Sequence, residues 1–215
     1  TMYALGVGVG SGAADLQLVY ERHAEGFRTF PTYGVIPAMN AMIARAIRGE
    51  QAPGLNYGPE RLLHGEQYME LYYPMPPKAT LTHKTKVKEI WDKGKGAIVN
   101  LEAKSYDESG NLLVKNEFIS FVRGAGVYGG DRGPSLDVNS PPNRQPDHVT
   151  AEKIGDNQAL LYRLSGDWNP LHVDPGFAQA FGFDRPILHG LCTFGFACRH
   201  VINRFFGGDP RYFKS

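Results

Sequence analysis

The sequence is poor in cysteine, with only Cys192 and Cys198 among its 215 residues. The two lie six residues apart in a segment that we expect to be helical, so their side chains point to different faces and a mutual disulfide is not expected. No CxxC pair or His/Cys cluster shows the spacing of a zinc site. This scarcity excludes a disulfide-stabilised scaffold, and two free thiols suit a reducing compartment.

Long apolar runs and an excess of charge of one sign are also missing. No run approaches the roughly 18 apolar residues that span a bilayer. The 23 Lys and Arg residues nearly balance the 22 Asp and Glu residues, so no strong field attracts nucleic acid or an anionic membrane. We therefore expect a globular protein of one large domain or two small ones, with no nucleic-acid partner and no membrane span.

Three segments alternate polar and apolar residues with the period of a β-strand, namely Thr80 to Ile90, Ala97 to Tyr106 and Leu112 to Phe121. Lys93-Gly94 and Ser109-Gly110-Asn111 supply turn residues between them. The pattern predicts an antiparallel meander.

Apolar residues at helical spacing predict two long helices, from Val35 to Ile47 and from Gly190 to about Phe206. Pro53-Gly54 stops the first pattern. A further helix is expected around Lys153 to Leu164. The fold class is therefore α+β.

The segment from Val122 to Asp147 is rich in Gly, Pro, Asn and Ser, which indicates a linker. It contains a G-x-G-x-x-G string at Gly124, Gly126 and Gly129. The dinucleotide fingerprint needs a helix after its glycines, whereas residues 130–134 forbid one here. We expect a loop and no dinucleotide cofactor.

The two halves of the chain echo each other. Residues 16–20 resemble residues 158–162, and residues 32–35 resemble residues 193–196, with about nineteen more residues between the landmarks of the second copy. The first copy continues into the meander, whereas only nine residues follow Phe206. We expect a duplicated unit whose second copy is truncated here, with about 60 to 80 further residues of antiparallel strand after Ser215.

The extra residues hold a dense polar string, Tyr162 to His172. Pro170 excludes a regular helix, so Asp167, Asn169 and His172 lie on a turn where their side chains can converge. An acid and an imidazole in one site can bind a water from two sides. Alternatively, these side chains only tie a loop together.

Two helix starts follow this string. Asp174-Pro175 caps a short helix that Gly182 ends. Gly190 opens the second long helix, where free N–H groups point outward and the dipole is positive. That makes a potential oxyanion site for a thioester carbonyl; the alternative is a glycine needed only for helix entry.

The strings Y-R-L-S-G-D-W-N-P-L-H and G-F-D-R-P-I-L-H-G-L-C-T-F-G resemble the MaoC-like hydratases, and most closely the hydratase 2 domain of peroxisomal multifunctional enzyme type 2. The resemblance covers essentially the whole chain, including residues 3–8 and 63–68. It implies a double hot-dog fold, in which a long helix is wrapped by an antiparallel sheet and the unit is duplicated. The N-terminal unit would span residues 1–130, the linker 131–150 and the catalytic unit 151–215.

The resemblance also implies the activity, the reversible hydration of trans-2-enoyl-CoA to (3R)-3-hydroxyacyl-CoA in fatty-acid β-oxidation. Asp167 and His172 would position and activate water, Asn169 would orient them, and the Gly190 N–H would hold the thioester oxygen. Substrate contacts would come from the following residues: His64, Gly65, Lys93, Trp168, Pro170 and Leu171. Glu21, which follows Tyr20 of the repeated string, is also expected to face the site.

Further expectations follow from the resemblance. No metal or redox cofactor is needed, the protein is a homodimer within a longer multifunctional chain, and it is peroxisomal if eukaryotic and cytoplasmic if bacterial. Two alternatives stay open. One is a hot-dog thioesterase, or a dehydratase running the reverse reaction; the other is a non-catalytic acyl-CoA-binding or assembly module.

Overall fold

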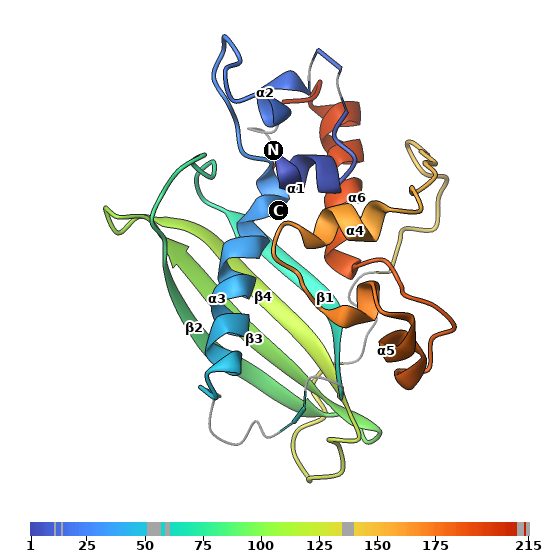
Figure 1. Cartoon of the computed structure of the whole chain (residues 1–215). Helices are drawn as coiled ribbons and strands as arrows, with labels where there is room; N and C mark the ends of the chain where they lie inside the picture. The colour runs from blue at the N-terminus through green and yellow to red at the C-terminus, as the bar shows by residue number, and fades with distance from the viewer. Residues whose placement is uncertain are drawn as a thin grey trace.

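A computed structural model describes residues 1–10, 12–13, 15–50, 57–58, 61–134, 140–209 and 213. Four strands form one antiparallel sheet in the order β1-β4-β3-β2 (Figure 1). They are β1 (Leu62–Leu71), β2 (Thr82–Asp92), β3 (Gly96–Tyr106) and β4 (Leu112–Arg123). The predicted meander is confirmed as β2, β3 and β4.

Strand β1 was not expected from its pattern. Its polar run from His64 to Gln67 breaks the alternation, and the register against β4 shifts between His64 and Glu66, around Gly65. A bulge of this kind places one extra residue in the strand and turns the side chains on either side of it. Strand β1 pairs with β4 on one side only, so it forms one edge of the sheet.

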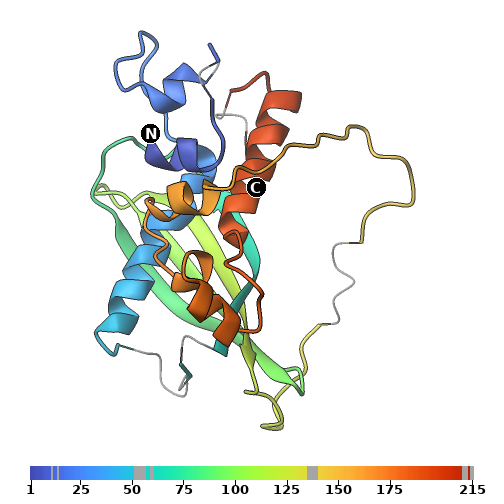
Figure 2. The same ribbon diagram turned by 45° about the vertical axis from the view of Figure 1, so that its right-hand side comes forward.

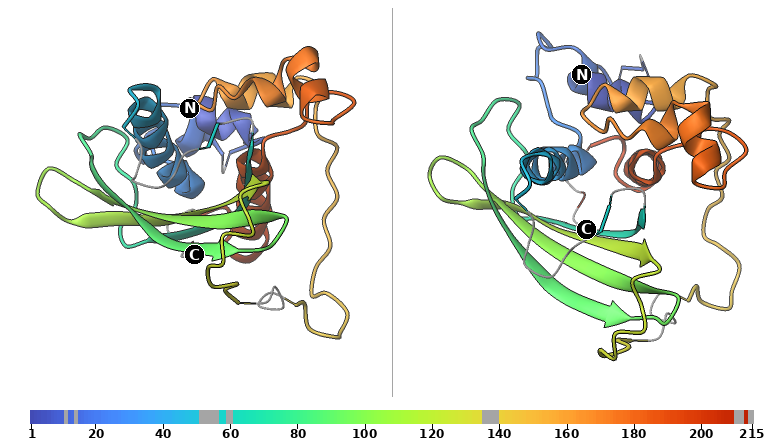
Figure 3. Two further views of the ribbon diagram at one scale, coloured as in Figure 1. Left: turned by 90° about the horizontal axis from the view of Figure 1, so that it is seen from below. Right: turned by 60° about the horizontal axis from the view of Figure 1, so that its bottom comes forward.

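Two long helices lie side by side over one face of the sheet (Figures 1 and 3). They are α3 (Ile36–Ile47), preceded by the 3-10 turn η1 (Pro31–Val35), and α6 (Gly190–Phe205). Ile36 and Met39 of α3 are buried, as predicted from the apolar stripe. A long helix laid on a curved antiparallel sheet is the hot-dog arrangement, so the expected α+β class is confirmed.

Helix α6 buries only part of its apolar stripe. Leu191, Cys198 and Ile202 are buried, whereas Val201 and Phe205 are exposed. Among the residues that the structure describes, the second half contributes helices and no strand. Both cysteines are buried and free, as expected.

The rest of the second half that lies beside α6 consists of short helices and turns. They are α4 (Gln158–Arg163), the 3-10 turn η4 (Pro170–His172) and α5 (Pro175–Ala180), while α1 (Met2–Gly6) and α2 (Leu16–Val19) belong to the first half. A helix was predicted around residues 153–164, and the predicted start is wrong. Gly155 instead forms a turn, accepting from the Gln158 N–H at 3.0 Å, and the helix begins only after it.

The three helices α1, α4 and α6 pack closely against one another. Gly6 and Gly195 make this possible: a Cβ at Gly195 would lie 2.3 Å from a Val7 methyl group, and one at Gly6 would lie 3.1 Å from the Tyr162 backbone. Tyr162 is fully buried between α1 and α6. This packing fixes the end of α4, from which the polar turn departs.

The described residues 124–134 of the linker pack against the β2–β3 turn, whereas residues 140–150 run apart from the sheet (Figure 2). No helix follows the glycines of its G-x-G-x-x-G string in the described residues up to 134, as expected. The predicted helix stop at Pro53-Gly54 lies outside the described residues. No helix in the described part of the chain is both long and apolar enough to cross a bilayer.

Candidate functional site

The polar turn between α4 and α5 presents Asp167 and His172. Pro170 opens η4, and the Asn169 side chain caps this turn by accepting the Leu171 N–H at 3.0 Å. Leu171 is buried and anchors the turn in the core. Asn169 therefore shapes the turn that holds Asp167 and His172.

The tautomer of His172 follows from its surroundings. Its Nδ1 lies 2.8 Å from the Ile187 carbonyl oxygen. A carbonyl oxygen can only accept, so Nδ1 carries the hydrogen and the neutral ring keeps a lone pair on Nε2. His172 is thus held with Nε2 available as a proton acceptor, which is what a general base requires.

His189, the residue before α6, joins this pair and was not among the expected site residues. It is 1% exposed, and its ring stacks on His172 with centroids 3.7 Å apart. Its Nε2 lies 3.2 Å from the Asp167 main-chain oxygen. Burial, together with the nearby His172, lowers the pKa of His189 to about 4. The His189-Gly190 dipeptide before the helix is the sequence signal for this residue, but the prediction from the sequence took only Gly190 as a site residue.

One polar atom from each of Asp167, His172 and His189 lies within 4.8 Å of the others. Two acceptors at such a separation can both bind a single water at about 2.8 Å. Carboxylate and imidazole are also zinc ligands. However, the planes of the two stacked imidazoles differ by only 28°, so their in-plane lone pairs do not converge on one point. The arrangement therefore suits a water better than a metal ion.

Gly190 begins α6 directly beside this cluster. A Cβ built on it meets no atom within 4 Å, so the space beside this glycine is open. The first amides of a helix have no partner inside it. The Gly190 N–H therefore remains a candidate for the predicted oxyanion donor.

The first half contributes His64 from β1. His64 is exposed, but desolvation by surrounding protein atoms still lowers the pKa of its imidazole, while the Asp167 carboxylate acts in the opposite direction. The Asp167 carboxylate therefore acts on the charge of His64. Gly65, in the bulge beside it, is also exposed. His64 is thus the expected substrate contact of β1 that interacts electrostatically with the polar turn.

The remaining expected contacts differ in their surroundings. Trp168 is exposed, and its ring stacks under the Arg163 guanidinium at 4.5 Å. Pro170 is exposed as well, so both can meet a ligand. Leu171 is 5% exposed and so supports the turn from within the core, which makes a direct substrate contact by its side chain the least favoured of the three.

Lys93 and Glu21 are engaged elsewhere. The Lys93 ammonium donates to the Pro134 carbonyl at 2.9 Å and lies over the Trp91 ring, so it fastens the linker to the β2–β3 turn. Glu21 is exposed after α2 and accepts a hydrogen bond from Thr1. Neither residue contacts Asp167, His172 or His189 within the described ranges.

Gly166 ties the turn to the first half. Its φ is +122°, and a Cβ there would lie 2.2 Å from the Asn40 amide nitrogen on α3. Only glycine adopts this backbone conformation without strain while approaching Asn40 so closely. The residue just before Asp167 is therefore positioned by a helix of the other half.

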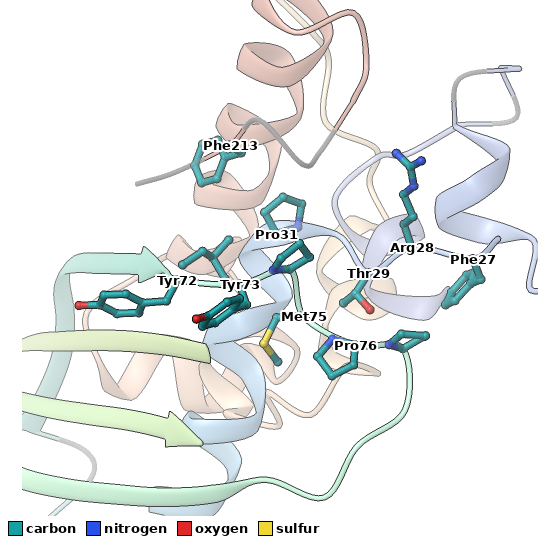
Figure 4. Close-up of a pocket in the computed structure, with 12 residues that line it drawn as sticks. Phe27, Arg28, Thr29, Pro31, Tyr72, Tyr73, Met75, Pro76 and Phe213 are labelled. Atoms are coloured by element: carbon teal, nitrogen blue, oxygen red, sulfur yellow. The ribbon is translucent and has the colours of Figure 1, made fainter. Parts of the chain in front are cut away.

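A cavity of about 290 Å³ lies away from this cluster (Figure 4). Its lining comes mainly from the end of β1 and the segment after it, with Arg28 as its one charged residue. Arg28 pairs with Asp209 at 3.1 Å. Asp167, His172 and His189 do not line the cavity, so the polar cluster is a separate feature of the molecule.

Comparison with known proteins gives two family matches. The model of the MFE-2 hydratase 2 N-terminal domain matches residues 1–124, and that of the MaoC-like domain matches residues 137–214. The chain is 45% identical to peroxisomal multifunctional enzyme type 2 of Mus musculus, covering all of this chain and 29% of that protein. It is 44% identical to peroxisomal enoyl-CoA hydratase 2 of Arabidopsis thaliana, covering 73% of that protein.

A solved structure agrees with the sequence matches. The MaoC-like dehydratase of Phytophthora capsici superposes with a TM-score of 0.86 at 38% identity, over 99% of this chain and 73% of that one. The polar turn and the start of α6 both lie inside the MaoC-like match, and the sheet with α3 lies inside the other.

Proposed function

The chain belongs to the hydratase 2 family of MaoC-like proteins, and from this premise we propose that it reversibly adds water to trans-2-enoyl-CoA, giving (3R)-3-hydroxyacyl-CoA. The observation that carries the proposal is the cluster of Asp167, His172 and His189, whose polar atoms lie within 4.8 Å of one another. It stands directly before Gly190, the first residue of α6. The names of the relatives supply the substrate class.

The chemistry follows from the geometry. The thioester carbonyl accepts from the Gly190 N–H, which draws electron density away from C3 of the enoyl group. A water held between Asp167 and His172 then bonds to C3 through its oxygen while His172 Nε2 takes one of its hydrogens as a proton. The C2=C3 electrons move toward the carbonyl, whose developing charge the helix N-terminus stabilises. A proton from the pair reaches C2 and completes the addition.

We propose further that the reaction needs no metal or redox cofactor, since the two stacked imidazoles do not direct their lone pairs to one point. His64 and Gly65 of the first half and exposed Trp168 of the turn are the proposed substrate contacts. The family resemblance further supports a homodimer. Residues 1–130 and 151–215 would be the substrate-holding and catalytic units, joined by the linker 131–150.

The cellular setting is also a proposal. Two relatives are named peroxisomal, which supports a peroxisomal site and a part in β-oxidation for a eukaryotic source. The mouse relative is multifunctional by name and much longer than this chain, which supports a place within a longer multifunctional chain.

The decisive experiment follows crotonyl-CoA and a longer trans-2-enoyl-CoA by the loss of enoyl absorbance, with chiral analysis of the product. We expect hydration and the 3R isomer. Release of free CoA without hydration would indicate a thioesterase, and binding without turnover would indicate an acyl-CoA-binding module. Rapid oxidation of the product by a 3S-specific dehydrogenase would refute the stereochemical assignment.

A further inference from the structure

We propose that His189 is a positioning residue for the hydration reaction, holding Asp167 and His172 in their reactive arrangement. This inference rests on the proposed function. It concerns a buried histidine that does not need to touch the substrate and that acts through two neighbours. Three contacts of its ring carry the argument, one to each of Asp167, His172 and Tyr162.

The first contact fixes the main chain of Asp167. Since the Asp167 carbonyl can only accept, His189 Nε2 carries the hydrogen and donates it across 3.2 Å. The preceding Gly166 is restrained by its close approach to Asn40, and the Asp167 main chain needs a further restraint of its own. The hydrogen bond from His189 supplies one, and it links the polar turn to the start of α6, where Gly190 lies.

The second contact fixes the ring plane of His172. The two rings stack with centroids 3.7 Å apart and planes 28° from parallel. The hydrogen bond to Ile187 holds one edge of the His172 ring, but a single bond leaves rotation about itself. The flat face of His189 removes that freedom, because any turn of the His172 ring would drive it into its neighbour. His172 Nε2 therefore points in one direction.

The charge state of His189 suits this role. The Tyr162 ring packs against the His189 ring, with centroids 4.9 Å apart. The Nδ1 atom of His189 is buried without a partner among the described residues. The charged or titratable groups that face it are His172, Asp167, Arg163 and Tyr162. Burial favours the neutral ring. A neutral His189 does not repel the positive charge that His172 acquires when it takes a proton from water.

Two substitutions separate the two contacts. His189→Gln keeps an N–H donor near the position of Nε2 but removes the ring, and His189→Phe keeps a stacking ring but removes the donor. His200→Gln is the matched control, since His200 lies on the same helix and pairs with Glu152 instead. Measurements are kcat and KM with crotonyl-CoA, their pH profiles, the unfolding temperature, and the ¹⁵N imidazole spectrum of His172.

We expect kcat to fall about 10-fold to 100-fold in both His189 variants, the scale of a small misplacement of reacting groups, with KM within threefold of wild type. The His172 spectrum should lose its single Nδ1–H tautomer, and the basic group in the kcat profile should shift. His200→Gln should match wild type.

Several results would overturn the proposal. The first is an unchanged kcat in either His189 variant that folds. The second is a purely structural effect, in which the unfolding temperature falls while kcat per folded molecule, the pH profile and the His172 spectrum all stay as in wild type. If wild type itself does not hydrate crotonyl-CoA, the proposed function fails. The His172 spectrum then still decides whether His189 orders that ring, because it needs no substrate.

Discussion

Main-chain carbonyls determine the chemistry of the two histidines. The Ile187 and Asp167 oxygens each accept one ring hydrogen, from Nδ1 of His172 and from Nε2 of His189. The two histidine rings, which stack on each other, are therefore held in opposite tautomers. His172 keeps the Nε2 lone pair for proton transfer, whereas the buried Nδ1 of His189 has no hydrogen-bond partner in the described part of the chain.

The first prediction tests the proposed acid–base pair. Asp167→Asn and His172→Gln should each lower kcat for crotonyl-CoA hydration at least about a hundredfold, the scale of general acid–base catalysis. Both changes are nearly isosteric, so the unfolding temperature should stay close to that of wild type. A variant that retains wild-type kcat would remove its residue from the catalytic role.

The second prediction isolates a single N–H group. Gly190→Pro deletes the proposed oxyanion donor, and the first position of a helix tolerates proline. His189, at φ −60° and ψ 133°, already has the backbone conformation that precedes a proline. We expect kcat to fall about 10²-fold to 10³-fold, as when one oxyanion donor is removed.

Gly190→Ala is the matched control, because it keeps the N–H and its Cβ meets no atom within 4 Å. It should retain kcat within about threefold, on the reasoning that the added methyl group costs no packing. Equal losses in the alanine and proline variants would show that space at the helix end matters, and not the N–H.

At the scale of elements, the polar turn is held by the core, by η4 and by α3. Leu171 anchors it in the core, η4 fixes its exit, and Gly166 rests against Asn40 of α3. Hydrogen bonds inside the turn shape it locally, including those from the Gly166 N–H to the Arg163 carbonyl and from the His172 N–H to the Asn169 carbonyl. Its placement relative to α3 and the core depends on the contacts with its neighbours.

The third prediction compares two glycines with positive φ. Gly166→Ala forces a Cβ into a φ of +122° and into the Asn40 side chain, whereas Gly182→Ala meets a φ of +83° and open space. The second change should cost about 1–2 kcal/mol in unfolding free energy from the backbone alone. The first should cost about 2–4 kcal/mol, with crowding added.

The two variants should also differ in activity. Moving the turn displaces Asp167, so Gly166→Ala should lower kcat at least tenfold or so, while Gly182→Ala should leave it unchanged. Denaturant melts and crotonyl-CoA kinetics on both proteins check this. Similar kcat values in the two variants would mean that the approach of Asn40 to Gly166 does not position the turn.

At the scale of the whole molecule, the candidate site depends on both halves of the chain. The polar turn and α6 come from the second half, while His64 on β1 and Asn40 on α3 come from the first. The sheet is stabilised on its other face by an ion-pair cluster. There Glu117, with a side chain 10% exposed, accepts from Lys88 and Asn100 and pairs with Lys115.

The fourth prediction is a two-step loss of stability in acid. Burial lowers the pKa of His189 from its ordinary 6.5 to about 4, so the unfolded state binds the extra proton between these values. Stability should therefore fall as pH drops from about 6.5 to 4, by on the order of 3 kcal/mol. Burial would raise the pKa of Glu117, but hydrogen bonds from Asn100, Lys88 and Lys115 hold it at about 2.

Glu117 consequently stabilises the fold above pH 4.5, and this contribution is lost as pH falls from 4.5 toward 2. Denaturant unfolding at each pH measures both steps. His189→Phe should flatten the upper step only, and Glu117→Gln the lower step only. If both variants keep the wild-type pH dependence, other groups control acid unfolding.

Strand and helix periodicity determined much of this fold. The alternation in β2, β3 and β4 and the apolar stripes of α3 and α6 follow from which faces must be buried, and local capping placed α5 behind Asp174. Pro170 alone required a turn at the polar string. These are short-range effects, so a single sequence contains them.

Contacts between distant segments were decided only by the tertiary structure. The bulge at Gly65 interrupts the alternation that would have revealed β1, and the turn at Gly155 shortened α4. His189 was missed because its role comes from stacking on a residue 17 positions earlier in the chain, and Lys93 was expected at the site although its ammonium binds the linker. Residue types and spacing predict which groups can act together, but only packing determines which neighbour each side chain meets and therefore which proton it carries.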